Sequence, residues 1–146
     1  MQSKRSLLAV AAAILSLAAL APAVAATPRN GDIHITKECS AYNGAAGEFC
    51  TITSSNVPAI PIGTKVIYLS AVNWPILDTA IVLDPPGPGN NRAFGHVHLD
   101  VPAGDGTVTF SGGTGVFTWF YGSADVSALG GFDWGWEGTY SFGPRD

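Results

Sequence analysis

Two imidazoles and a carboxylate alternate along one short segment of the chain. His96, His98 and Asp100 are separated by single aliphatic residues, so in a strand the three polar side chains point to one face. Such a set could form part of a zinc or copper site. A further strong ligand would be needed, and His34 is the one other histidine. Alternatively, the aliphatic residues face a core and the histidines face solvent. We favour that alternative, expect no metal and no cofactor, and retain His96 and His98 as metal-ligand candidates.

Asp125 and Glu137 are the carboxylates best placed for general acid or base chemistry, and His96 is a third candidate. In an expected strand over Val116–Val126, Asp125 shares a face with aromatic residues, whose surroundings would desolvate the carboxylate and raise its pKa. The alternative is a carboxylate at a strand end in water. Glu137 lies opposite a tryptophan-rich face and is expected to be solvated. No serine stands in a Gly-x-Ser-x-Gly nucleophile elbow.

Aromatic side chains gather in the last third of the chain and could wall a pocket for a small apolar molecule. The alternative is a dry, packed core. Tyr68 and Arg92 are polar groups that such a pocket could contain. The candidate ligand-binding residues are Phe117, Trp119, Tyr121, Trp134, Trp136 and Tyr140, with Trp74 and Phe120 as further wall residues.

Glycine and proline punctuate the chain, and β-branched and aromatic residues fill the segments between them. This pattern predicts short strands joined by turns, with no helix after the N-terminal segment. Eight strands at this spacing indicate a sandwich or a closed barrel, and we expect an eight-stranded antiparallel β-barrel. The expected strands are Asp32–Lys37, Glu48–Ser54, Lys65–Ala71, Asp78–Leu83, Arg92–Val101, Gly106–Ser111, Val116–Val126 and Gly131–Phe142.

The last two expected strands carry most of the aromatic residues. Alternation places Phe132, Trp134, Trp136, Tyr140 and Phe142 on one face of the last strand, interrupted by Gly138. The preceding strand has Phe117, Trp119 and Tyr121 on one face and Phe120, Ala124 and Val126 on the other. Because that strand is apolar on both faces, one face could pack against a partner subunit in a homo-oligomer.

The first 26 residues have the features of a signal peptide. Lys4 and Arg5 precede an apolar run of about 14 residues, and small residues follow at 21–26. The run is shorter than the roughly 20 residues that span a bilayer, so a retained anchor is the less favoured alternative. We expect a secreted or periplasmic protein with one domain over residues 27–146. An outer-membrane barrel is disfavoured because several expected strands are too short.

Charge and cysteine content restrict the environment of the mature chain. Without Lys4 and Arg5, five basic residues face 11 acidic ones, a net charge of −6. With no basic cluster, neither nucleic acid nor stable membrane insertion is expected. The two cysteines, Cys39 and Cys50, are expected to form a structural disulfide in an oxidising compartment, with free thiols as the alternative.

One glycine-rich stretch and several short motifs carry a family resemblance. The chain resembles a bacterial secreted branch of the allene oxide cyclase barrel-like and dirigent-like superfamily, over about two-thirds of the mature part. The motifs are Gly112-Gly113-Thr114-Gly115-x-Phe117 with Gly122-Ser123, then Gly95-His96, Leu99-Asp100, Gly106-x-x-x-Phe110 and Trp134-x-Trp136-x-Gly138-Thr139-Tyr140-x-Phe142.

This resemblance implies an eight-stranded antiparallel barrel with a cavity at one end, often in dimers or trimers. Members with known activity guide cyclisation or radical coupling of hydrophobic molecules without a cofactor. The family's acidic, amide and arginine catalytic positions have no match here, so no catalytic residue is carried over, and the mature chain is shorter than plant members.

Three functions follow as hypotheses. The first is an exported barrel that binds a small hydrophobic molecule. The second is a cofactor-free cyclase or dirigent-like enzyme, for which Asp125 or His96 would supply the polar group. The third is a structural or interaction protein of the cell envelope that acts through the doubly apolar strand.

Overall fold

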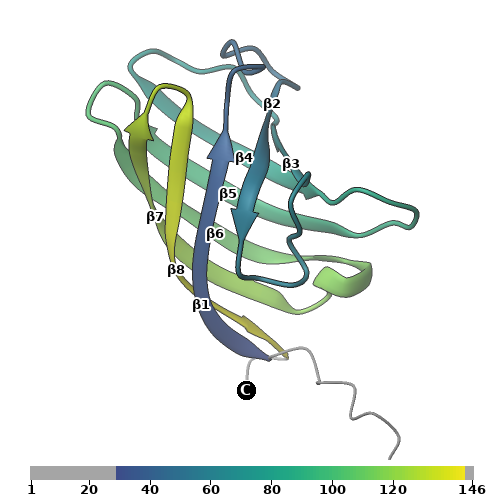
Figure 1. Cartoon of the computed structure of the whole chain (residues 1–146). Coiled ribbons are helices and arrows are strands. Elements are labelled where there is room, and N and C mark those ends of the chain that lie inside the picture. Colours follow the sequence, from purple (N-terminus) through teal and green to yellow (C-terminus); the bar gives the residue numbers. More distant parts are fainter. Residues whose placement is uncertain (1–28, 144–146) are drawn as a thin grey trace, which may run out of the picture.

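Segments rich in β-branched and aromatic residues form eight strands that close into an antiparallel barrel, as the sequence predicted (Figure 1). The computed structural model describes residues 29–143. Each strand pairs with its neighbours in the chain, and β1 pairs with β8 to close the barrel, which excludes the sandwich. The strands are β1 (Asn30–Glu38), β2 (Phe49–Ser55), β3 (Lys65–Tyr68), β4 (Ile76–Asp84), β5 (Arg92–Asp100), β6 (Asp105–Thr114), β7 (Phe120–Gly130) and β8 (Asp133–Phe142).

The barrel interior is filled by side chains that alternate inward along each strand. Aliphatic residues occupy the middle, and aromatic residues fill the half to which β6, β7 and β8 contribute. Among the buried residues are Ile33, Ile52, Val66, Ile81, Val97, Val108, Phe110, Phe120 and Trp136, each at most 3% exposed. The middle of the barrel is therefore a packed core, and open space has to be sought at its ends.

The seventh strand begins later than the sequence predicted. Gly115–Phe117 forms a short 3₁₀ helix, η1, and Trp119 has a positive φ of 64° before β7 starts at Phe120. These irregular residues break the alternation, so Phe117 is buried while Trp119 is half exposed. The expectation that Phe117, Trp119 and Tyr121 share one face was wrong because it assumed one continuous strand.

The outer face of β7 is mostly polar, which corrects the expectation of a strand that is apolar on both sides. Phe120, Ala124 and Val126 point inward and are buried, whereas Ser123, Asp125 and Ser127 are exposed on the outside. The aromatic face expected on the last strand is also shorter, because Phe132 lies in the turn before β8 and is 63% exposed.

Close packing of β7 on β8 explains the glycine that interrupts the aromatic face. A Cβ on Gly138 would lie 2.0 Å from the carbonyl oxygen of Ser123 and 2.5 Å from Cα of Ala124. Only glycine permits this approach, because those neighbours are backbone atoms that a side chain cannot displace.

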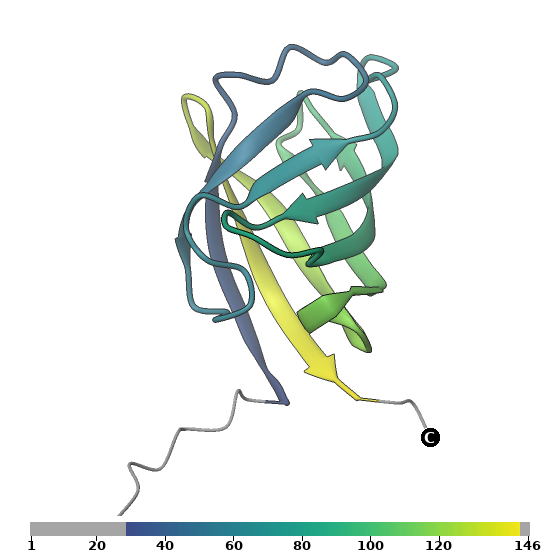
Figure 2. The same cartoon turned by 90° about the vertical axis from the view of Figure 1, so that its right-hand side faces the viewer.

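The two ends of the barrel differ (Figure 2). The long β1–β2 loop and the β7–β8 turn lie at one end, and η1 lies at the other, beside the start of β1 and the end of β8. Cys39 and Cys50 form the expected disulfide, with Cα atoms 4.4 Å apart, and it ties the two ends of the β1–β2 loop together.

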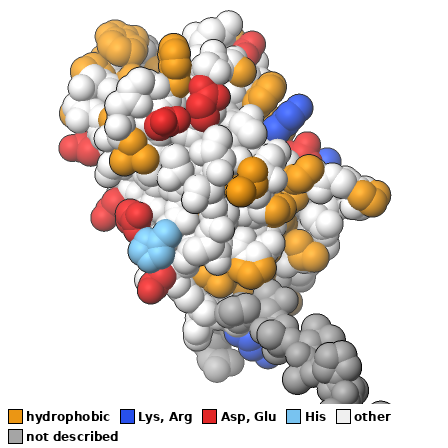
Figure 3. Space-filling model, in the orientation of Figure 1, with side chains coloured by type: hydrophobic (Ala, Val, Ile, Leu, Met, Phe, Trp, Pro, Cys, Tyr) orange, Lys and Arg blue, Asp and Glu red, His pale blue; other side chains and the backbone are white. Residues whose placement is uncertain are grey.

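Apolar and acidic side chains are spread over the outer face formed by β8, β1 and β2, and basic side chains are few and separated there (Figure 3). Within residues 29–143, no helix is long and apolar enough to cross a membrane. The predicted signal peptide falls outside the described residues.

Candidate functional site

A cavity of about 240 Å³ opens at the barrel end that carries the β1–β2 loop and the β7–β8 turn. We call it the Lys37 cavity, after the lysine that contributes to its lining. The disulfide and Tyr68 also border it. Its remaining walls are largely apolar and include Tyr42, Leu77, Leu99, Val101, Phe132 and Trp134.

Strand alternation places Lys37 inside the barrel. Ile33, Ile35 and Lys37 follow one another on the inward face of β1, and the lysine is only 3% exposed. Its Nζ donates a hydrogen bond to the Tyr68 hydroxyl oxygen at 2.5 Å and lies 4.8 Å from the centre of the Trp136 ring. Lys37 is thus held by a phenol and an aromatic face.

No carboxylate among residues 29–143 forms an ion pair with Lys37. Burial without a counter-charge disfavours the ammonium form and lowers the pKa of Lys37 from 10.5 to about 7. Burial also raises the pKa of Tyr68, and the nearby Tyr42 raises it further. Near neutral pH the cavity therefore contains a lysine that is in part a free amine, next to a phenol that keeps its proton.

Tyr42 is positioned by the β1–β2 loop. Its backbone N–H donates to the carbonyl oxygen of Cys39 at 3.0 Å, and its ring centre lies 4.6 Å from that of Tyr68. Cys50, at the other end of the loop, has its Sγ 3.4 Å from the Tyr68 hydroxyl. The disulfide therefore fixes the loop against the Lys37–Tyr68 pair.

Two buried donors near the Lys37–Tyr68 pair have no hydrogen-bond partner among the described residues. They are the Tyr42 hydroxyl, on a residue that lines the cavity, and Nε1 of Trp136, whose ring lies under the Lys37 amine. Buried polar groups are usually paired, so unpaired ones beside a cavity indicate a place where a polar ligand atom would be stabilised.

The predicted ligand-binding residues are divided among three environments. Trp134 lines the Lys37 cavity and Trp136 lies next to the lysine. Phe117 and Tyr140 are buried in the aromatic core, both packed on Phe120. Trp119 is exposed on the surface and Tyr121 is partly exposed on the outer face of β7. The proposed aromatic wall therefore does not exist as one surface.

The predicted acid and base residues lie outside the barrel. Asp125 is exposed on the outer face of β7, so the expectation that aromatic neighbours desolvate it was wrong. Glu137 is exposed on β8, as expected, and its carboxylate contacts Nδ1 of His34. His96 is also exposed. None of the three contributes to the lining of the Lys37 cavity.

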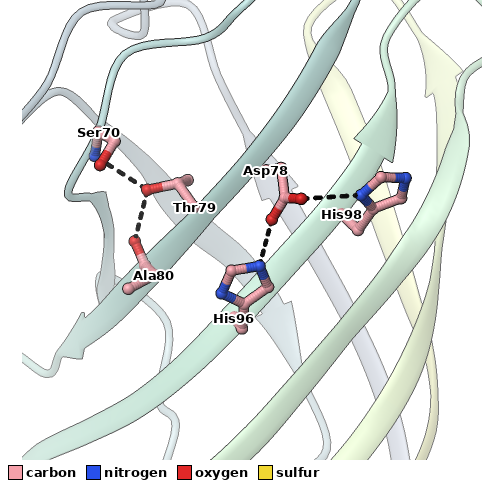
Figure 4. A network of polar contacts seen from close by, with 6 residues as sticks. All are labelled: Ser70, Asp78, Thr79, Ala80, His96 and His98. Carbon is pink, nitrogen blue, oxygen red and sulfur yellow. Dashed lines mark hydrogen bonds and ion pairs between the residues drawn. The ribbon is translucent and has the colours of Figure 1, made fainter.

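His96 and His98 face outward on β5, as the alternative to a metal site predicted, and both contact Asp78 on β4 (Figure 4). Nδ1 of His98 lies 3.4 Å from a carboxylate oxygen of Asp78. Hydrogen bonds from His96 and then His98 lower the pKa of Asp78. Residues 29–143 contain no group of three or more His, Cys, Asp or Glu side chains arranged to hold a metal ion.

A larger cavity, of about 540 Å³, lies at the opposite end of the barrel. Prolines of the β2–β3 and β4–β5 loops form much of its wall, together with Arg29, Val116 and Phe142. It is more open than the Lys37 cavity and its lining contains no buried ionisable side chain. For that reason the smaller cavity is the better candidate for specific binding.

Of the polar groups named from the sequence, Tyr68 lies in the cavity and Arg92 does not. Arg92 instead forms an ion pair with Asp84, N to O 3.0 Å. Lys37 was missed, although a signal was present: it continues the inward series of Ile33 and Ile35, and a lysine on an apolar face is unusual.

No family model, no curated protein and no solved structure matches this chain. The relationship to the allene oxide cyclase barrel-like superfamily therefore stays a prediction.

Proposed function

We propose that this protein is an exported β-barrel that binds one small, largely apolar molecule in the Lys37 cavity. The observation that carries this proposal is the pairing of apolar walls with a few convergent buried polar groups at one end of a packed barrel. Ligand sites usually combine these features, with the apolar wall supplying affinity and the polar groups fixing orientation. The disulfide is consistent with export to an oxidising compartment.

A neutral fluorescent probe, N-phenyl-1-naphthylamine, tests the proposal. Val101 lines the Lys37 cavity, and Val116 lines the larger cavity at the other end. Both are incompletely buried, so Val101→Trp and Val116→Trp are matched additions of bulk. We expect saturable binding of one probe per chain, a loss of affinity of about tenfold or more in V101W, and no change in V116W.

The reverse pattern, with binding lost in V116W and kept in V101W, would contradict the proposal and assign binding to the larger cavity. Absence of saturable binding in the unmodified chain would also contradict it. D125N serves as a control for the outer surface and should bind the probe like the unmodified chain.

The residues from which the two other functions were predicted lie on the outside of the barrel, away from the Lys37 cavity. Asp125 and His96, proposed for a cyclase or dirigent-like enzyme, are exposed outside the barrel. The outer face of β7, proposed for envelope interactions, is mostly polar. A homo-oligomer likewise stays a prediction.

A further inference from the structure

Lys37 is an amine for which the barrel interior provides no salt-bridge partner. The groups around it are the Tyr68 hydroxyl on β3, the Trp136 ring on β8 and the ring of Tyr68 itself. Tyr42 on the β1–β2 loop is the other titratable group nearby, packed on Tyr68. Lysines that act only as charges usually point to water or pair with a carboxylate, and Lys37 does neither.

A lysine desolvated among apolar groups is one of the activated nucleophiles that proteins use toward carbonyl compounds. The amine must be unprotonated to attack, and the low pKa of Lys37, about 7, makes the free amine abundant at neutral pH. The lysine also lines a cavity, so a carbonyl compound held there would lie next to its side chain.

We propose that Lys37 captures an aldehyde or ketone as an imine, so that the Lys37 cavity holds a carbonyl-bearing apolar molecule covalently and reversibly. This inference rests on the proposed function, since it specifies the chemical class of the molecule bound in the same cavity.

The reaction balances without a cofactor. The lone pair on Nζ attacks the carbonyl carbon, a C–N bond forms, and a proton moves from nitrogen to the former carbonyl oxygen to give a carbinolamine. Loss of that hydroxyl as water, together with the second amine proton, gives the C=N bond. The net change is amine plus carbonyl to imine plus water, with no oxidation or reduction.

The neighbouring phenols suit this sequence of proton transfers. The Tyr68 hydroxyl is hydrogen bonded to Nζ and can pass a proton between nitrogen and oxygen. The Tyr42 hydroxyl, which is buried without a partner among the described residues, is a donor available to a ligand oxygen. Both phenols keep their protons at neutral pH, as ordinary tyrosines do, and burial raises their pKa values further.

Reductive trapping tests the inference. The full protein is incubated at pH 7.4 with 2-naphthaldehyde and sodium cyanoborohydride, which converts an imine into a stable secondary amine, and adducts are assigned by peptide mass spectrometry. The described residues contain two lysines, Lys37 and the exposed Lys65, so Lys65 is the matched control. We expect one adduct per chain, at Lys37, formed at least about tenfold faster than at Lys65.

Two variants accompany the trapping experiment. Lys37→Met keeps a long apolar chain in the barrel and should lose the fast adduct, while Lys65→Met should keep it. Tyr68→Phe should slow adduct formation at Lys37, because the hydroxyl that passes the proton is removed. Lys65→Met should bind 2-naphthalenemethanol, an alcohol that cannot form an imine, like the unmodified chain. Thermal unfolding of each variant establishes that it is folded before trapping is compared.

Equal labelling of Lys37 and Lys65 would overturn the inference. Tight binding of the alcohol, or of 2-naphthoate, without a trapped aldehyde would also overturn the inference. In that case the proposed function stands and only the covalent step fails. If neither the alcohol nor the aldehyde associates with the cavity, both the inference and the proposed function fail.

Discussion

The Nζ atom of Lys37 donates a hydrogen bond to the Tyr68 hydroxyl inside the barrel, where the two residues are 3% and 2% exposed. The two side chains come from strands β1 and β3, which are not neighbours in the sheet. Each points into the interior because it stands at an inward position of its strand. Their pairing near one end of the barrel is the feature on which the proposed binding site rests.

The first prediction concerns the pH dependence of stability. The pKa of Lys37 is about 7 in the folded chain and near 10.5 when unfolded, so between these values the unfolded state binds more protons. The free energy of unfolding should therefore rise by roughly 1 kcal/mol per pH unit from about pH 7 to pH 10. Below pH 7 the full cost of burying the ammonium is present in the folded state.

Above about pH 10 the trend should reverse. The pKa values of Tyr68 and Tyr42 are raised in the folded chain, so the unfolded chain loses these protons first and stability falls as pH increases. Urea unfolding from pH 6 to pH 11 measures both limbs. Lys37→Met should flatten the rising limb, whereas Lys65→Met should leave it unchanged; a rising limb that survives in K37M would assign the proton to another group.

The second prediction concerns the disulfide. It closes a loop of 12 residues, whose cross-link contributes about 3 kcal/mol by restricting the unfolded chain. The double variant Cys39→Ala and Cys50→Ala should lose about that much stability in urea unfolding. It should also bind the naphthylamine probe more weakly, because the loop that carries Tyr42 is no longer fixed. Reduction of the unmodified chain should reproduce both effects, and unchanged stability in both preparations would contradict the prediction.

The third prediction concerns the contact of β7 with β8. Gly138→Ala places a Cβ about 2.0 Å from a backbone oxygen and should cost roughly 1–3 kcal/mol or prevent folding. Gly135→Ala is the matched control on the same strand, because its Cβ would meet only the flexible side chain of Leu129 at 3.3 Å. Thermal unfolding compares the two. Equal stability of G138A and G135A would show that the strands can separate at little cost.

The fourth prediction concerns Asp78 on the outer surface. Its pKa is lowered first by the hydrogen bond with His96 and then by that with His98. Carboxyl NMR titration should show the Asp78 midpoint moving up toward the ordinary range in H96Q, with a smaller rise in H98Q. The control is H34Q, since His34 contacts Glu137 on another part of the barrel. An equal Asp78 midpoint in all three variants would contradict this assignment.

Much of the fold could be predicted from local patterns. Strand alternation depends only on a two-residue period, and turns are marked by glycine and proline. The eight strands were therefore located to within a few residues at most ends. The outward position of His96 and His98 followed from the same period. The start of β7 could not be predicted, because the alternation of apolar and polar residues does not indicate the 3₁₀ turn or the positive φ of Trp119 that precede the strand.

The sequence by itself determined the strand succession, the cysteine pair and the inward position of Lys37, since each depends on neighbours along the chain. Only the tertiary structure decided that Lys37 is buried beside Tyr68 and Trp136. Pairing of β1 with β8 brings Trp136 to the lysine, and the curved sheet brings Tyr68 on β3 to it across β2. Asp125 is exposed because it alternates with Ala124 and Val126, which point into the barrel. The two-residue alternation of a strand decides whether a side chain points into or out of the barrel. The shape of the closed sheet decides which other side chains it contacts.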